Sequence, residues 1–391
     1  MKIFIVKLSL IVFCFLQQGY AQKGIFKKGE VFPEQFTDTL KVEFIDDMIF
    51  VKVEIEGIDY RFILDTGAST FIGSNVKGNF KIFAKQNSMD TYNRTQEINY
   101  VSIPSLKIGN LNYKNITSGQ YDLETLKHID VDGILGANIM AKGVWDFDME
   151  NNIIIISDKY DNKLYTNPIK SKMKLASTGS PLITINYFDK IKEKNAYLDF
   201  GYNGIFSMAP KAYTKLKKKG LIKQEVHGSG ELGFSAFGVN NASMYVTKID
   251  TQIGELQFNN FLADVESDEE SIIGCEILNY YRIILDFKNK DIYYIPTGKK
   301  PPSEFKTYGI HYQKTDSNLQ VSFVWQNASN KGIKVKDKIL SVNNIDVSDI
   351  DKITEENLSE INKLFASGKP IVLEINSQGN YVKLEQDILI N

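Results

Sequence analysis

The sequence has few cysteines and histidines for its length. Two cysteines and three histidines occur among 391 residues, and His128, His227 and His311 have no cysteine or acidic pattern of ligand spacing around them. These numbers are too small for a zinc ribbon or an iron–sulfur cluster, so we expect no metal and no cofactor. Any hydrolytic chemistry should therefore depend on carboxylates or hydroxyls.

The chain also lacks an excess of charge of either sign. It has 46 lysines and arginines against 48 acidic residues, which gives a formal net charge of −2. Without a basic field, the chain is not expected to hold nucleic acid or an anionic membrane non-specifically. A hydrophobic content of 43% and a charged content of 24% are typical of a folded globular protein, and the length predicts two or three domains.

No apolar run approaches the roughly 20 residues that span a bilayer, so an integral membrane protein is not expected. At the N-terminus, Lys2 and Lys7 precede a shorter apolar stretch, and small residues follow up to Ala21. This pattern predicts a signal peptide over residues 1–21 and export to a periplasmic or extracellular location, with a short uncleaved anchor as the alternative. Cleavage would leave Cys275 alone, so no intrachain disulfide could form.

Alternating apolar and polar residues predict a mainly β protein. Residues 51–64 alternate on both sides of Gly57, which is typical of a β-hairpin with one buried face. Similar short strands recur to about residue 296. One helix is expected at about residues 212–219.

Three landmarks occur twice in the same order. The aspartate of an Asp-Thr-Gly sequence, Asp65, corresponds to Asp199, which is 134 residues later. An Ile-Gly segment at Ile108 recurs 145 residues later, and an apolar-apolar-Gly segment at Ile134 recurs 138 residues later. Because chance similarity would not preserve both order and spacing, we expect two homologous β units.

The residues around Asp65 make it a candidate for chemistry. Asp65 ends an apolar strand and is followed by Thr66, Gly67 and, two positions further, Ser69. Glycine lets the backbone come close, while the hydroxyls can donate hydrogen bonds that hold the loop and keep the aspartate charged. A lone Asp-Thr-Gly is a weak signal, but the downstream apolar-apolar-Gly segment and the second copy at Asp199 strengthen it.

These motifs resemble the pepsin/retropepsin family of aspartic proteases over roughly residues 40–297. The resemblance implies two retropepsin-like β-barrel lobes, residues 22–168 and 169–297, which form a pseudo-dimer and contribute one aspartate each. Asp65 and Asp199 would share one proton, so that one carboxylate deprotonates a water and the other protonates the carbonyl oxygen of the scissile peptide. This implies an exported aspartic endopeptidase that acts on a peptide or protein substrate.

The second copy departs from the family pattern at Phe200, where a threonine or serine is expected. In the family, these hydroxyls join the two loops and hydrogen-bond the dyad. Gly201 keeps the expected glycine, but Asn203 replaces the counterpart of Ser69. The alternative to an active peptidase is therefore an inactive peptide-binding protein. Pairing of Asp65 from two chains is a further alternative, although this chain supplies its own second copy.

Aspartic proteases also cover the substrate with a flexible β-hairpin flap. Residues 227–238 contain four glycines and two phenylalanines, which suits a mobile cover, and an uninvolved surface loop is the alternative. The counterpart in the first copy, at about residues 90–100, is polar, and only its position indicates a flap. The candidate flap residues are Gly228, Gly230, Gly233 and Phe234.

A change in composition after Ile295 indicates a third domain. Prolines and lysines at residues 296–302 predict a stiff linker. Beyond it, residues 303–391 hold strand-like runs and apolar residues at helical spacing over 355–365. We therefore expect a small α/β domain at the end of the chain.

Residues 332–347 resemble the central segment of bacterial PDZ domains. The resemblance implies that Tyr308, Gly309 and Ile310 form a loop whose backbone N–H groups receive the C-terminal carboxylate of a peptide ligand. Such a domain would raise the concentration of substrates near the dyad. A domain that only packs on the lobes is the alternative.

Overall fold

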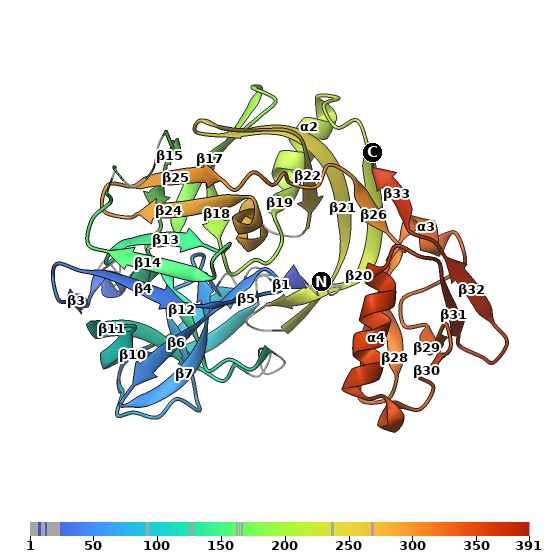
Figure 1. Ribbon diagram of the computed structural model, residues 1–391, viewed down its shortest axis with the longest axis horizontal. Coiled ribbons are helices and arrows are strands. Elements are labelled where there is room, and N and C mark those ends of the chain that lie inside the picture. The colour runs from blue at the N-terminus through green and yellow to red at the C-terminus, as the bar shows by residue number, and fades with distance from the viewer. Residues whose placement is uncertain are drawn as a thin grey trace.

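The computed structural model describes residues 7–8, 12–13, 24–90, 94–123, 126, 129–161, 163, 165, 167–235, 238–266 and 270–390. We call residues 24–157 the N-terminal unit, 169–296 the central unit and 305–390 the C-terminal unit. Figure 1 shows the C-terminal unit, in orange and red, beside the long strands of the central unit. The rest of the predicted signal peptide, and His128, lie outside the described residues.

The N-terminal unit is a β structure with an apolar interior. The predicted hairpin is present, because β6 pairs antiparallel with β7 and places Val51 opposite Phe62. Val53 and Phe62 are buried while Lys52 is exposed, as the alternation requires. The elements of this unit are η1 (Ile25–Lys27), β3 (Glu30–Phe32), β4 (Thr37–Lys41), β5 (Glu43–Ile45), β6 (Met48–Ile55), β7 (Ile58–Asp65), β8 (Phe71–Gly73), β9 (Lys81–Asp90), β10 (Thr95–Ile108), β11 (Leu111–Tyr121), β12 (Gly133–Gly136), α1 (Ala137–Met140), β13 (Val144–Asp148) and β14 (Ile153–Ser157).

The central unit contains the predicted helix, which begins two residues earlier than expected. A proline occupies the first turn of α2, and Gly220, with a φ of +66°, follows its C-terminus. The elements of this unit are β15 (Ile169–Lys172), β16 (Lys174–Leu175), β17 (Pro181–Tyr187), β18 (Ile191–Asp199), β19 (Phe206–Met208), α2 (Pro210–Lys218), β20 (Glu225–Ser235), β21 (Gly238–Ile253), β22 (Leu256–Val265), β23 (Ile272–Gly274), η3 (Cys275–Asn279), β24 (Tyr281–Asp286) and β25 (Asp291–Pro296).

The C-terminal unit packs strands and one longer helix around its own core. The helix begins at a capping box, in which Thr354 and Asn357 exchange hydrogen bonds, and it buries Ile361 and Phe365. Its elements are β26 (Phe305–Thr307), β27 (Ile310–Lys314), β28 (Leu319–Trp325), α3 (Gln326–Ser329), β29 (Lys338–Val342), β30 (Ile345–Asp346), η4 (Ile350–Lys352), α4 (Glu355–Ala366), β31 (Ile371–Ile375), β32 (Tyr381–Leu384) and β33 (Asp387–Ile390).

One sheet joins the N-terminal and central units. Its strands run in the order β15, β25, β24, β13, β14 and β4, so β13 of the N-terminal unit pairs with β24 of the central unit. Trp145 and Phe147 on β13 and Leu285 on β24 are buried in the same apolar core. The two units are therefore bound by main-chain hydrogen bonds and by a shared core.

Both units also present an aspartate at the end of a strand in the same way. β7 ends at Asp65, and it pairs in parallel with β12, which ends at Gly136. β18 ends at Asp199, and it pairs in parallel with β23, which ends at Gly274. The repeated apolar-apolar-Gly segments thus lie directly beside the two aspartate strands.

Among the described residues, no helix combines the length and hydropathy needed to cross a bilayer. The N-terminal strands β1 (Lys7–Leu8) and β2 (Val12–Phe13) pair with β20 and β9, respectively. Figure 1 shows β1 next to β20. Residues within the predicted signal peptide therefore pair with both of the hairpins described below.

Candidate active site

The two repeated loops bring their aspartates face to face. A Cβ added to Gly67 would lie 2.5 Å from Cγ of Asp199, and a Cβ added to Gly201 would lie 2.4 Å from Cγ of Asp65. No side chain tolerates such a contact, so each loop needs glycine at the point where the opposite carboxyl approaches. The structure therefore brings together Asp65, Asp199 and the two predicted loop glycines.

Backbone N–H groups of the loops hold one oxygen of each carboxyl. Oδ1 of Asp65 accepts hydrogen bonds from the N–H groups of Gly67 at 2.7 Å and Ala68 at 2.8 Å. Oδ1 of Asp199 accepts from Gly201 at 2.8 Å and from Gly67 of the other loop at 3.1 Å. Oδ2 of each carboxyl has no donor among the backbone and side-chain groups of the described residues. One oxygen of each group is fixed, and the other is left for the partner carboxyl or a substrate.

Burial and proximity shift the titration of both aspartates upward. Both side chains are fully buried. Burial is the largest cause that raises the pKa of Asp65 well above its usual value, and the charge of Asp199 raises it further. Burial also raises the pKa of Asp199, while hydrogen bonds from Asp65 and from the loop N–H groups partly oppose this shift. Together these effects favour a pair that holds one proton, shared between the two carboxyls.

The hydroxyl of Thr66 joins the two loops. Oγ1 of Thr66 donates to the carbonyl oxygen of Leu198 at 2.7 Å and accepts from the N–H of Phe200 at 2.8 Å. The reciprocal lock is absent from these loops because Phe200 has no hydroxyl. The ring of Phe200 is fully buried and packs in a T-shaped arrangement with the ring of Phe147, with 4.9 Å between the ring centroids. Phe200 thus replaces a polar contact between the loops with apolar packing against β13.

Residues that the sequence motifs did not identify also support the Asp65 loop. Asn138 accepts hydrogen bonds from both the N–H and the hydroxyl of Thr70, at 2.7 and 2.8 Å. Ser180, from the central unit, donates to the carbonyl oxygen of Gly67 at 2.8 Å. Ser69, which the sequence predicted as a support, is buried in the same loop. Thr70 directly precedes β8, and Asn138 lies in α1 after β12, so only the fold brings the two residues together.

Both predicted flap regions are β-hairpins. β20 pairs with β21 around the candidate residues of the central unit, and β9 pairs with β10 in the N-terminal unit. Gly233 and Phe234 lie near the end of β20 and pair with β21 and with β1. Gly228 and Gly230 lie further from the tip, where β20 pairs with β28 of the C-terminal unit.

The loop predicted to receive a peptide carboxylate precedes β27. The ring of Tyr308 is buried, and its hydroxyl donates to the carbonyl oxygen of Lys369 at 2.7 Å. The N–H of Gly309, whose φ is +92°, donates to Oγ1 of Thr307 at 3.0 Å. Ile310 already belongs to β27 and lies opposite Val324 of β28. An incoming carboxylate would therefore have to displace Thr307 to use the N–H of Gly309.

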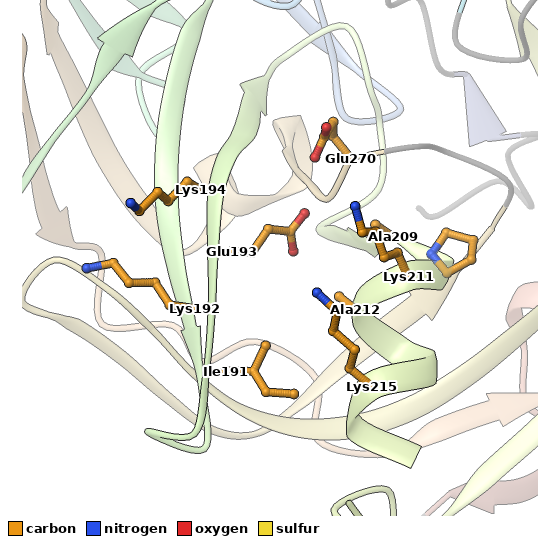
Figure 2. A pocket seen from close by; sticks show the side chains of 10 residues that line it. Ile191, Lys192, Glu193, Lys194, Ala209, Lys211, Ala212, Lys215 and Glu270 are labelled. Carbon is orange, nitrogen blue, oxygen red and sulfur yellow. The ribbon is translucent and has the colours of Figure 1, made fainter. Parts of the chain in front are cut away.

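A cavity of about 540 Å³ lies elsewhere, between β18 and α2 (Figure 2). Glu193, Lys211 and Lys215 point into it, while Lys192 and Lys194 point away. Glu193 is already satisfied by neighbouring side chains and backbone. The lining does not include either aspartate loop, so this cavity is separate from the aspartate pair. In the part of the chain that the structure describes, no cluster of side chains fits a metal ion.

Part of the chain is similar to a known protein family. Residues 51–139 match the aspartyl protease family. That stretch contains the Asp65 loop and β12, and it supports a hydrolase of the peptidase class that acts through aspartate. None of the curated proteins matches the sequence. Among solved structures, an aspartic proteinase from Irpex lacteus is similar, with a TM-score of 0.43 and 13% identity, over 68% of this chain and 99% of that chain.

Proposed function

We propose that the chain is an exported aspartic endopeptidase in which Asp65 and Asp199 form one catalytic pair. The observation that carries this proposal is the reciprocal contact of the loops, in which each glycine lies against the opposite carboxyl. Residues 22–168 and 169–297 are the two lobes of the proposed pseudo-dimer. The second lobe supplies the aspartate that the aspartyl protease match, over residues 51–139, does not include.

The chemistry follows from a pair of carboxyls that holds one proton. The ionised carboxylate takes a proton from a water, whose oxygen attacks the carbonyl carbon of the scissile peptide, while the protonated carboxyl gives its proton to the carbonyl oxygen. The C–N bond then breaks as the nitrogen takes a proton from one carboxyl, while the other carboxylate takes the proton of the hydroxyl that becomes the product carbonyl. Burial raises the pKa of both carboxyls, which favours a pair in which one member holds the proton and the other is ionised.

The two hairpins are the proposed covers of the bound peptide. An extended substrate can add to their edges as a strand, because main-chain hydrogen bonds do not depend on sequence. The pairing of β1 with β20 and of β2 with β9 supports this role, since a short strand of this chain lies along each of the two hairpins. The C-terminal unit, proposed as a PDZ domain, would bind substrate tails along β27.

Digestion of a mixed peptide library tests this function. We expect residues 22–391 to cut peptides in acid, and we expect Asp65→Asn to lose at least about 10³-fold in rate because an amide can act as neither the acid nor the base of the pair. Asp59→Asn is the control, since Asp59 is an exposed residue near the start of the same strand, β7. Failure of the wild type to cut at any pH would contradict the proposal.

The one-sided lock of the loops favours a second candidate function, a peptide-binding protein that has lost catalysis. In that case Phe200 would prevent Asp199 from acting as a base, but the hairpins would still bind extended peptides. Equilibrium binding of the same library to wild type and to Asp65→Asn separates the two functions. Binding without cleavage in both proteins identifies the binding protein.

A further inference from the structure

The β20–β21 hairpin is shared between the central and C-terminal units. β20 pairs with β21 along one edge and with β28 along the other, where Gly228 lies opposite Trp325 and Gly230 lies opposite Phe323. Figure 1 shows β20 at the border between the two units, next to the C-terminal domain. Main-chain pairing thus connects the C-terminal unit to a hairpin that is proposed to cover the bound peptide.

The two glycines of β20 are required by this contact. A Cβ on Gly228 would lie 2.3 Å from Cε1 of Phe323 and 2.9 Å from Cε3 of Trp325. At Gly230, whose φ is +141°, a Cβ would lie 2.2 Å from the carbonyl oxygen of Ser322. Glycine in a strand often marks a close approach of another chain segment, and that is its role here. The composition that predicted a freely mobile flap is therefore explained, at these two positions, by docking.

An apolar cluster reinforces the strand pairing. Phe323 and Trp325 are buried against Met244 and Val246 of β21, and Ile390 of β33 completes the cluster. The rings of Phe323 and Trp325 meet at 5.1 Å between centroids. Because buried aromatic side chains contribute strongly to an interface, separating the hairpin from the C-terminal unit would be costly.

We propose that the C-terminal unit positions the β20–β21 hairpin over the aspartate pair, with Phe323 and Trp325 as positioning residues. The inference rests on the proposed protease function, and it gives the C-terminal unit a second role besides substrate recruitment. It implies that this unit affects cleavage even of a peptide too short to reach it.

Gly228→Ala tests the proposal in the full chain, because the added methyl pushes Phe323 and Trp325 away without touching the dyad. For a peptide of about eight residues, which spans less than about 30 Å, we expect kcat/KM to fall at least about tenfold, mainly through KM. The pH profile should stay unchanged, because the aspartates are not altered. Gly24→Ala is the matched control, since a Cβ there meets nothing within 4 Å.

Hydrogen exchange gives a readout that does not depend on catalysis. We expect the amides of residues 225–230 to exchange at least about tenfold faster in Gly228→Ala than in wild type, because the pairing with β28 weakens. Phe323→Leu, a milder change on the other side of the contact, should also speed this exchange. Phe323→Leu removes the ring atoms that the methyl of Gly228→Ala would contact. The double variant, Gly228→Ala with Phe323→Leu, should therefore regain part of the lost kcat/KM.

Two results would overturn the proposal. The first is exchange of residues 225–230 that is unchanged in both Gly228→Ala and Phe323→Leu. The second is a kcat/KM within about twofold of wild type in Gly228→Ala despite faster exchange, which would show that the hairpin position does not matter. If the wild type itself cuts nothing, the proposed function fails, and the exchange data still decide whether the units are coupled.

Discussion

Thr66 provides a side-chain hydroxyl that connects the two aspartate loops. Its hydroxyl is buried and makes two hydrogen bonds to the backbone around Asp199, one as donor and one as acceptor. Phe200, at the corresponding place in the second loop, contributes apolar packing instead. The position of Asp199 relative to Asp65 therefore depends more on Thr66 than it would in a symmetric pair.

Thr66→Val is expected to weaken the site and the fold together. Valine matches threonine in shape but leaves the carbonyl of Leu198 and the N–H of Phe200 without a partner. Each buried unsatisfied group costs about 1–3 kcal/mol, so the free energy of unfolding should fall by about 2–5 kcal/mol. Urea unfolding measures this change, and the rate of peptide cleavage should fall as well.

Thr39→Val is the control for this substitution, because Thr39 lies exposed on β4. A loss of less than about 0.5 kcal/mol in Thr66→Val, equal to that of an ordinary surface change, would show that the hydroxyl does not hold the loops together.

Among the elements, the pairing of β13 with β24 fixes the N-terminal and central units relative to each other. Arg282 of β24 crosses to β13, where Nε contacts Oδ1 of Asp146 at 2.7 Å and Nη1 contacts Oδ2 of Asp148 at 2.6 Å. The two carboxyls are about nine-tenths buried, with side-chain exposures of 8% each. This ion network therefore supports the sheet that places the two aspartate loops opposite each other.

Arg282→Ala should destabilise the protein by about 3 kcal/mol or more, because it leaves two nearly buried carboxylates without their cation. The midpoint of urea unfolding measures the effect. Lys52→Ala is the matched control, since Lys52 pairs with Asp59 on the surface and such pairs contribute at most about 1 kcal/mol. Equal losses in the two variants would contradict a structural role for the network.

The same elements show what a single sequence can predict. The hairpin at β6 and β7, the helices α2 and α4, and the correspondence of Asp65 with Asp199 follow from local patterns and from the internal repeat. The contact of Ser180 with Gly67 could not be predicted, because these residues are 113 positions apart and share no motif. Gly228 shows a different limit of sequence-based prediction. Glycine occurs both in flexible turns and where two segments pack closely, and only the fold shows which of the two applies at Gly228.

At the scale of the whole molecule, three units depend on one another. A shared sheet joins the N-terminal and central units, and the pairing of β20 with β28 extends the central sheet into the C-terminal unit. The linker at residues 296–302 predicted a separate last domain and left its packing on the lobes open. In the structure, this domain is docked against the central unit through strands and an apolar cluster. Because the units share strand pairing and apolar contacts, we expect a substitution in one unit to change the stability of the units that contact it.

The central claim is that Asp65 and Asp199 act as one acid–base pair in a single chain. Because burial and the neighbouring charge raise the pKa of Asp65 above the usual 3.8, the shared proton is retained at higher pH than an ordinary aspartate would allow. Activity should therefore rise as the first carboxyl of the pair ionises. It should fall at a pH above 3.8, once the shared proton is lost.

The measurement that tests this claim most directly is kcat/KM against pH for wild type and Asp199→Asn, with the wild-type enzyme monomeric at the assay concentration. We predict a bell-shaped profile for wild type and a loss of at least about 10³-fold for Asp199→Asn at every pH, because an amide cannot act as the base. An Asp199→Asn variant as active as wild type would contradict the account, and the second aspartate would then have to come from elsewhere.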